Sequence, residues 1–385
     1  MPVASERTPH SLASYRAEFP LLEQCIYLNT CSLGALGTRS RHRVVEFLDV
    51  WSRRGAAAWY DTWWEALSTL RAAYARVISA HASEIALVPN ISVALSAVAE
   101  SLDYSARPRV VTTELDFPTV AYQWLAKEQR GVEVVVVESP DGVTVPVEAI
   151  AQATDERTAL IATSHVYFTT GAIQDIAAVA RTAHARGALC LIDAYQSVGQ
   201  VPTDVGAANV DFLAAGGLKW LLGGPGIAFL YARPASTASL SPRVTGWFAQ
   251  RNQLAFDIHH FELCEDARRF ETGTPALAAV HAQLGGLEVI EEIGVPAIRA
   301  ATSLLTEDLI QRARALGLRP RVAATVAERS AIVAIPHVSP AAAVTALAAH
   351  DIVADARPGH VRLSPYFYNT LDDHAAALEH LAARA

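Results

Sequence analysis

The chain has 385 residues, which exceeds the usual size of a single hydrophobic core and predicts a large domain with a smaller one. Apolar residues make up 51% of it and charged residues 18%, a balance typical of a packed globular protein and not of a disordered chain. A formal net charge of -8, with no basic arm or tail, argues against a nucleic-acid partner, because phosphate binding needs clustered lysine and arginine.

The N-terminal segment and the cysteines favour a cytoplasmic protein. Residues 1–17 carry charges and no apolar core, so they do not look like a signal peptide. Apolar runs such as 134–137 are far too short to span a membrane. The four cysteines have neither metal-ligand nor disulfide spacing, so we expect reduced thiols, no metal and no membrane partner. They are Cys25, Cys31, Cys190 and Cys264.

Short apolar segments, often β-branched, alternate with segments of helical periodicity in the first two thirds of the chain. Such strands suit a parallel sheet that is covered on both faces, and the alternation predicts a doubly wound α/β fold. Strands are expected at 109–113, 132–138, 159–164, 188–193, 212–215 and 227–231. Helices are expected at 92–102, 119–129, 146–153 and 175–186.

The pattern changes near residue 276, where long segments rich in alanine and leucine begin. This part predicts helices at 276–293, 295–316, 340–350 and 371–384, with a strand at 331–335. We therefore expect an N-terminal arm and a large domain in residues 1–275, followed by a small α+β domain in residues 276–385.

A carboxylate and an amine stand at the ends of two successive predicted strands. Asp193 closes the strand 188–193, and Lys219 follows the next strand after two glycines, so both lie at the ligand-binding edge of the sheet. Pyridoxal phosphate (PLP) needs a carboxylate that keeps its pyridine nitrogen protonated and a lysine that forms an imine with its aldehyde. Asp193 alone is as often a turn or cap residue, and Lys219 alone is more often a surface lysine. Together with Gln196 they favour this cofactor.

The arrangement resembles the class V aminotransferase family, which includes cysteine desulfurases, kynureninases, isopenicillin N epimerase-like proteins and C–S lyases. The resemblance covers nearly the whole chain, from residues 26–29 to residues 368–370. It implies a fold type I PLP-dependent enzyme that is a homodimer with active sites at the subunit interface. By this resemblance, Lys219 holds the cofactor as a Schiff base, Asp193 pairs with the pyridine nitrogen, and Gln196 lies against the ring O3′ oxygen.

Further cofactor-binding positions follow from the resemblance. Ile91 and Ser92 match the turn that binds the phosphate at the start of a helix, where free N–H groups face the anion. Phe117 matches the aromatic residue that stacks on the pyridine ring. Thr274 matches the residue that reaches the phosphate of the partner subunit, and Trp247 belongs to an interface loop. The ordinary alternatives are a helix-capping serine, a core phenylalanine and a packed tryptophan.

Two positions match substrate-binding residues of the family. Arg362 matches the arginine that grips the substrate α-carboxylate, a task suited to a planar guanidinium, and Asn29 lies on the N-terminal strand that faces the substrate. Desulfurases also carry a catalytic cysteine on a mobile loop before this arginine. Residues 355–361 contain no cysteine, which argues against desulfurase chemistry unless Cys31 takes that role.

The resemblance therefore implies chemistry at Cα of an amino acid and favours a β-eliminating C–S lyase. A class V aminotransferase is the alternative, followed by an epimerase and a kynureninase-like hydrolase. The non-enzyme alternative is a catalytically silent scaffold or sensor, against which the joint presence of Lys219, Asp193 and Gln196 argues.

Overall fold

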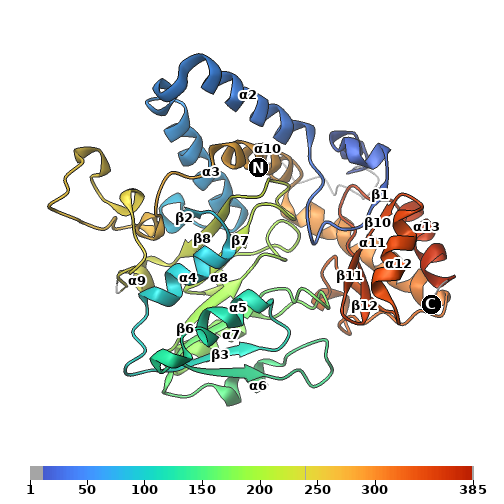
Figure 1. The fold of residues 1–385 in the computed structure, drawn as a ribbon. Coiled ribbons are helices and arrows are strands. Elements are labelled where there is room, and N and C mark those ends of the chain that lie inside the picture. Colours follow the sequence, from blue (N-terminus) through green and yellow to red (C-terminus); the bar gives the residue numbers. More distant parts are fainter. Residues whose placement is uncertain (1–11, 239, 384–385) are drawn as a thin grey trace, which may run out of the picture.

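A seven-stranded sheet lies at the centre of the larger part of the molecule in the computed structural model, which describes residues 12–238 and 240–383 (Figure 1). The strands are β2 (Ile85–Val88), β3 (Arg109–Thr113), β4 (Glu133–Val137), β5 (Thr158–Ser164), β6 (Leu189–Asp193), β7 (Phe212–Gly216) and β8 (Ala228–Ala232). Their order in the sheet is β2-β8-β7-β6-β5-β3-β4. Neighbours from β7 to β4 are parallel, whereas β8 is antiparallel to both β7 and β2.

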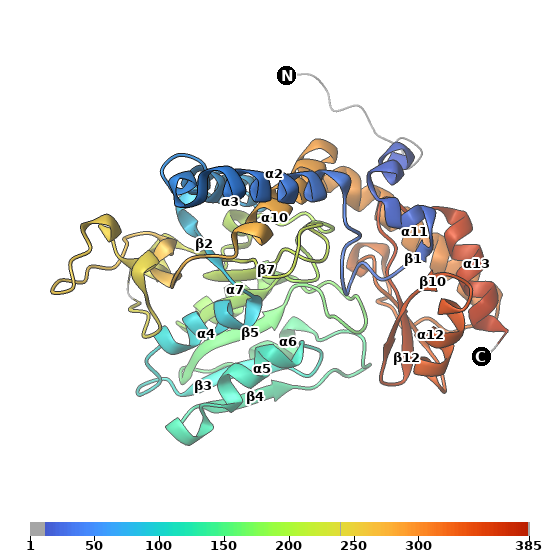
Figure 2. The same ribbon diagram turned by 45° about the horizontal axis from the view of Figure 1, so that its top comes forward.

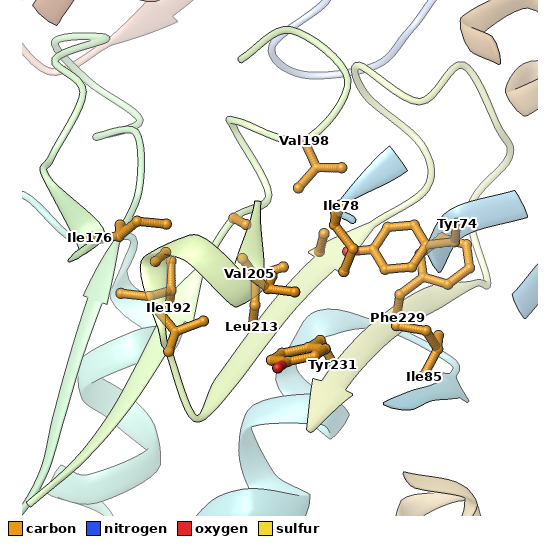
Figure 3. Packing of buried hydrophobic residues seen from close by; sticks show 14 of the residues in the cluster. Tyr74, Ile78, Ile85, Ile176, Ile192, Val198, Val205, Leu213, Phe229 and Tyr231 are labelled. Carbon is orange, nitrogen blue, oxygen red and sulfur yellow. The ribbon is translucent and has the colours of Figure 1, made fainter. Parts of the chain in front are cut away.

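Helices cover both faces of this sheet and enclose two separate apolar clusters. They include α3 (Trp63–Val77), α4 (Ile91–Ser101), α5 (Pro118–Leu125), α6 (Val147–Ala153) and α7 (Ile176–Ala185). Residues of α4 and α5 pack on one face, where Trp124 is fully buried. Residues of α3, α6 and α7 pack on the other, where Tyr74 stacks on Phe229 with ring centroids 3.9 Å apart (Figure 3).

The elements of this part agree closely with the sequence pattern. All six expected strands and all four expected helices are confirmed, with the strand ends shifted by at most one residue. The helix expected at 119–129 ends earlier, at Leu125, and a 3-10 turn, η5 (Glu128–Arg130), follows it. The pattern did not predict β2, because four apolar residues alone do not distinguish a strand from a buried turn of helix.

A second, smaller sheet lies at the other end of the molecule. It consists of β9 (Val333–Pro336), β11 (Asp355–Arg357) and β12 (His360–Leu363), with β12 in the middle and antiparallel to both neighbours. The helices around it are α11 (Val295–Ala315), α12 (Pro340–Ala348) and α13 (Leu371–Ala382). These elements confirm the expected α+β pattern. The expected helix end at Arg384 lies outside the described residues.

The N-terminal and C-terminal parts of the chain are interleaved. Strand β1 (Ile26–Tyr27) pairs in parallel with β10 (Ile352–Val353), so the N-terminal arm lies against the small sheet (Figure 2). Helix α10 (Leu277–Ile293), in contrast, packs on α2 (Thr38–Arg54) and α3 of the large part. A division of the chain at residue 275 therefore stays a prediction.

Residues 245–261 protrude from the end of the molecule opposite the small sheet (Figures 1 and 2). This arm contains two short 3-10 turns, η6 (Trp247–Ala249) and η7 (Gln253–Ala255). Phe248 is buried, but most of the other large apolar side chains of the arm are exposed, and that of Ile258 is 90% accessible. None of the helices in the described part of the chain is long and apolar enough to cross a membrane.

Candidate active site

The carboxyl ends of β3, β5, β6 and β7 meet at one edge of the large sheet. Asp193 is the last residue of β6 and pairs in register with Ser164 of β5 and Ala214 of β7. Lys219 follows β7 by three residues. The N-terminal arm crosses this loop, since the Gly34 N–H donates to the Leu218 carbonyl over 2.8 Å. A side chain at residue 34 would meet the Lys219 carbonyl oxygen at 2.3 Å, so only glycine allows this approach.

The amine of Lys219 lies among aromatic rings. Its Nζ is 4.2 Å from the ring centroid of Tyr195 and 6.0 Å from that of Phe117. Among the described residues, no carboxylate lies within ion-pair distance of it. Loss of hydration lowers the pKa of Lys219 to about 8, although Cys31 and Asp193 nearby oppose the shift. More of the amine is therefore neutral and nucleophilic near neutral pH than for a lysine in water.

The carboxylate of Asp193 is 5% exposed and has one free oxygen. Its Oδ1 accepts a hydrogen bond of 2.9 Å from the Tyr195 N–H, and Oδ2 has no donor among the described residues. Burial raises the pKa of Asp193 to about 6. A cation placed against Oδ2 would favour the ionised form, so the site suits the protonated nitrogen of a pyridine ring.

Asp116 fixes the turn that presents Phe117 to the site. Its carboxylate accepts hydrogen bonds from the backbone N–H groups of Thr113 (2.8 Å) and Ser164 (2.6 Å), and from neighbouring threonine hydroxyls. These bonds tie the end of β3 to the end of β5. Phe117 consequently points outward, remains 42% exposed, and packs edge-on against Phe168 with 5.1 Å between ring centroids. The Phe117 ring is therefore partly accessible to a flat ligand.

The start of α4 has the geometry of an anion site. Asn90 caps the helix by accepting a 3.0 Å hydrogen bond from the Val93 N–H, whereas the N–H groups of Ile91 and Ser92 precede the first bond within the helix. The Ser92 hydroxyl bonds to that of Thr119 over 2.7 Å. Because the Ile91 side chain is buried, only its backbone N–H is available to a ligand.

Gln196 is already engaged at both ends of its amide. Its Nε2 donates to the Cys31 carbonyl over 2.9 Å, and its Oε1 accepts from the Trp220 indole over 2.8 Å. A primary amide carries two N–H groups, so one donor is left for a cofactor oxygen. These bonds tie the N-terminal arm to the end of β6.

Arg362 is 1% exposed and is held from three sides. Its two terminal nitrogens donate to the Phe168 carbonyl, the Ser32 hydroxyl and the Asp355 carboxylate, while Nε has no partner among the described atoms. Asp355 also binds Arg357 over 2.8 Å. Asn29 bridges to Ser364, two residues beyond Arg362, so the two expected substrate-binding residues lie close together.

A family profile described as Aminotransferase class-V matches residues 52–373. The chain belongs to the class V aminotransferase family. It is 35% identical to the uncharacterized aminotransferase YcbU of Bacillus subtilis, over 97% of this chain and 98% of that protein. It is also 29% identical to a kynureninase of Geobacillus thermodenitrificans, over 77% of this chain and 72% of that protein.

Solved structures show the same fold. The apo structure of a cysteine desulfurase from Thermococcus onnurineus superposes with a TM-score of 0.87 at 23% identity, covering 99% of both chains. The complex of the cystine C-S lyase C-DES with cysteine persulfide also gives 0.87, at 21% identity over 94% of this chain and 99% of that one. The chain therefore has the fold type I architecture of PLP-dependent enzymes, as the sequence predicted.

This class V family member is a PLP-dependent enzyme, and pyridoxal phosphate is its cofactor. The residues present fit that group, since an amine, a buried carboxylate with a free oxygen, a partly exposed aromatic ring and a helix N-terminus follow strands at one edge of the large sheet. The individual role of each residue stays a prediction.

Two expected cofactor residues do not join this cluster within one chain. Trp247 is 42% exposed in the 245–261 arm, where its indole donates to the Gln253 carbonyl over 2.7 Å and its ring stacks on Phe256. Thr274 is exposed in the loop before α10. Both positions were expected to act across a subunit interface, so their distance from Lys219 in one chain agrees with that expectation without testing it.

Three residues at the site were not singled out from the sequence. Tyr195 contacts the Lys219 amine, Phe168 contacts Phe117 and accepts a hydrogen bond from Arg362, and Asp355 binds that arginine directly. Tyr195 could have been found, because it lies between two expected cofactor residues. Phe168 and Asp355 carry no such signal, because only the tertiary fold brings them to the site.

Proposed function

We propose that this enzyme is a β-eliminating C–S lyase that acts at Cα of an amino acid. Bound at Lys219, pyridoxal phosphate supplies an electron sink for the charge that develops at Cα. The Asp193 carboxylate keeps the pyridine nitrogen protonated, and the Lys219 amine removes the Cα proton. Arg362 orients the substrate carboxylate through its guanidinium, with Asn29 beside it. Phe117 and Tyr195 enclose the reacting atoms and exclude water.

The proposal includes a homodimer in which two chains complete each site. The N–H groups of Ile91 and Ser92 bind the phosphate from one side, and Thr274 of the partner subunit binds it from the other. The exposed 245–261 arm, which carries Trp247, supports a second copy as the surface that covers it. Four free cysteines support a reducing, cytoplasmic environment.

The hairpin β11–β12 is the observation that favours elimination. Arg357 pairs directly with His360, so only Pro358 and Gly359 form the turn, and Gly359 has a positive φ of 80°. This tight turn has no room for a mobile loop with an acceptor thiol. Without a thiol on this hairpin to accept it, the sulfur in our proposal leaves with the rest of the substrate as the Cβ–S bond breaks. After hydrolysis, the expected products are a thiol, pyruvate and ammonia.

An aminotransferase is the second candidate, favoured by the similarity to a protein named as an aminotransferase. The two reactions share the removal of the Cα proton and differ in the next step. Elimination needs a leaving group at Cβ and no second substrate, whereas transamination needs a 2-oxo acid to complete the cycle.

Product analysis of the purified holoenzyme separates these candidates. We expect S-alkyl cysteines to release pyruvate and ammonia without an added 2-oxo acid, and Lys219→Ala to abolish the release. Turnover that requires a 2-oxo acid and yields a new amino acid would instead establish an aminotransferase. The visible absorption band of the bound cofactor, together with covalent attachment of the cofactor by borohydride in the wild type and not in Lys219→Ala, checks that Lys219 binds the cofactor.

A further inference from the structure

A cavity of about 380 Å³ lies beside the segment that carries Phe117, whose ring centroid is 6.0 Å from the Lys219 amine. Asp116 and Pro118, on either side of Phe117, contribute to its wall, as does Phe168, whose ring packs against Phe117 and whose carbonyl binds Arg362. The hairpin that carries Arg362 closes the cavity through Pro358. The same segments therefore surround both the cavity and the expected position of the substrate.

Two charged side chains in this cavity lack an ionic partner. Glu114 and Arg321 both line it and are exposed to solvent, and neither has an oppositely charged group within 4.0 Å among the residues that the structure describes. The other carboxylate in the wall, Asp116, is saturated by five hydrogen bonds. Burial lowers the pKa of His360, which leaves that side chain neutral. Glu114 and Arg321 are thus the negative and positive groups that a ligand would meet.

A single turn holds these two charges apart. Glu114 accepts a 2.6 Å hydrogen bond from the Ser139 N–H, and Arg321 donates over 2.8 Å to the Gly142 carbonyl. Gly142 has a positive φ of 65°, and a side chain there would meet the guanidinium at 2.3 Å. The turn from Ser139 to Gly142 therefore sets the spacing between the carboxylate and the guanidinium. They face one cavity without neutralising each other.

We propose that this cavity binds a second α-amino-acid head group, with its ammonium on Glu114 and its carboxylate on Arg321. A charged pair of this polarity matches a zwitterion, whereas a lone cation would match only an acid. The substrate is then a bis-amino acid whose halves are joined through sulfur. One head group reacts at Lys219 and the other is held in the cavity. Only the sulfur link in this substrate rests on the proposed lyase function; the second head group is inferred from Glu114 and Arg321.

In that reaction the Cβ–S bond of the reacting half breaks and its electron pair stays on sulfur. The sulfur takes up a proton and leaves with the distal half as a thiol, or as a persulfide if the link is a disulfide. The reacting half becomes pyruvate and ammonia with uptake of one water. No oxidant or reductant is required.

Binding measurements on Lys219→Ala, loaded with pyridoxal phosphate to prevent turnover, test the proposal. The probes are L,L-lanthionine and S-ethyl-L-cysteine, which differ only in the distal head group. S-(2-carboxyethyl)-L-cysteine and S-(2-aminoethyl)-L-cysteine carry a distal carboxylate or a distal amine alone. We expect lanthionine to bind tightest, with each charged contact worth about three- to tenfold in Kd.

Two variants should remove these preferences separately. Arg321→Gln should abolish the advantage of probes with a distal carboxylate, and Glu114→Gln that of probes with a distal amine. Arg319→Gln and Glu138→Gln remove exposed charges near these positions but outside the cavity, and should change neither.

Equal Kd values for lanthionine and S-ethyl-L-cysteine, or preferences that survive both cavity variants, would overturn the proposal. The lyase function is judged independently by pyruvate release from wild-type enzyme. A head-group preference without pyruvate release would keep the subsite and reject the lyase. Pyruvate release without a head-group preference would keep the lyase and reject the subsite.

Discussion

At the scale of single residues, Lys219 combines a half-buried amine with the absence of an ionic partner. Its lowered pKa of about 8 means that the neutral amine predominates above that pH, instead of above the ordinary value of 10.5. We expect the rate at which the apoprotein captures pyridoxal phosphate covalently to rise with pH and to level off between about pH 8 and 9. Stopped-flow absorbance measures this rate, and a rise that continues towards pH 10 would contradict the shift.

Asp193 is predicted to weaken the apoprotein while enabling catalysis. Burial raises its pKa from 3.8 to about 6, so the folded chain binds the proton more tightly than the unfolded chain. The associated stability is complete below about pH 4 and is lost as the pH rises through 6. Asp193→Asn cannot ionise, so we expect its apoprotein to have a higher Tm than the wild type at pH 7.5 and a similar Tm near pH 4.

The same substitution should lower kcat by about 10²-fold or more, because a buried carboxylate no longer stabilises the protonated pyridine. Thermal scans of the apoprotein across pH and turnover of the holoenzyme check the two effects separately. A Tm difference that does not depend on pH would contradict the raised pKa of Asp193.

At the scale of secondary-structure elements, the N-terminus of α4 is predicted to bind the cofactor phosphate. Asn90→Ala removes the cap and should cost about 1 kcal/mol of stability. It should also raise the Kd for pyridoxal phosphate, because the first turn no longer presents its N–H groups in a fixed geometry. Asp175→Ala removes the equivalent cap of α7, which accepts from the Ala178 N–H over 2.9 Å.

Asp175→Ala is therefore a matched control for the loss of a cap. Both variants should lose similar stability in denaturant titrations, and only Asn90→Ala should bind the cofactor more weakly. If the two variants weaken cofactor binding equally, the effect comes from general destabilisation and not from the phosphate.

At the scale of the whole molecule, the prediction is a dimer with shared sites. If Thr274 binds the partner's cofactor, each active site takes Lys219 from one chain and Thr274 from the other. Lys219→Ala and Thr274→Asp then remove two different contributions to the same site. The homodimer of each single variant should be inactive. A mixed dimer should contain one site with both defects and one intact site, so co-expression should restore up to about half of the wild-type activity per mixed dimer.

Separately tagged chains allow the mixed dimer to be purified and assayed. A mixed dimer without activity would place Thr274 at the site of its own chain. A monomer in solution would reject the shared site altogether and leave the apolar residues of the 245–261 arm to another partner.

The sequence by itself determined the large sheet and the chemistry at its edge. Each of the six expected strands is a short, mostly apolar segment between turn or helix signals, and such segments suit the buried strands of a central sheet, although β8 is antiparallel to its neighbours. Asp193 is the last residue of one of these strands and Lys219 follows the next by three residues, so the order of the chain already brings them to one edge. Local pattern was sufficient for both conclusions.

Only the tertiary structure decided how distant segments complete the site. The Gly34 contact with the lysine loop, the bond from Arg362 to Phe168, and the opposed charges of Glu114 and Arg321 join residues far apart in the sequence. Local periodicity carries no information about such contacts, because they depend on how the arm, the large sheet and the small sheet pack together. The physical reason is that strand formation responds to neighbours in the sequence, whereas ionic partners and cavities respond to neighbours in space.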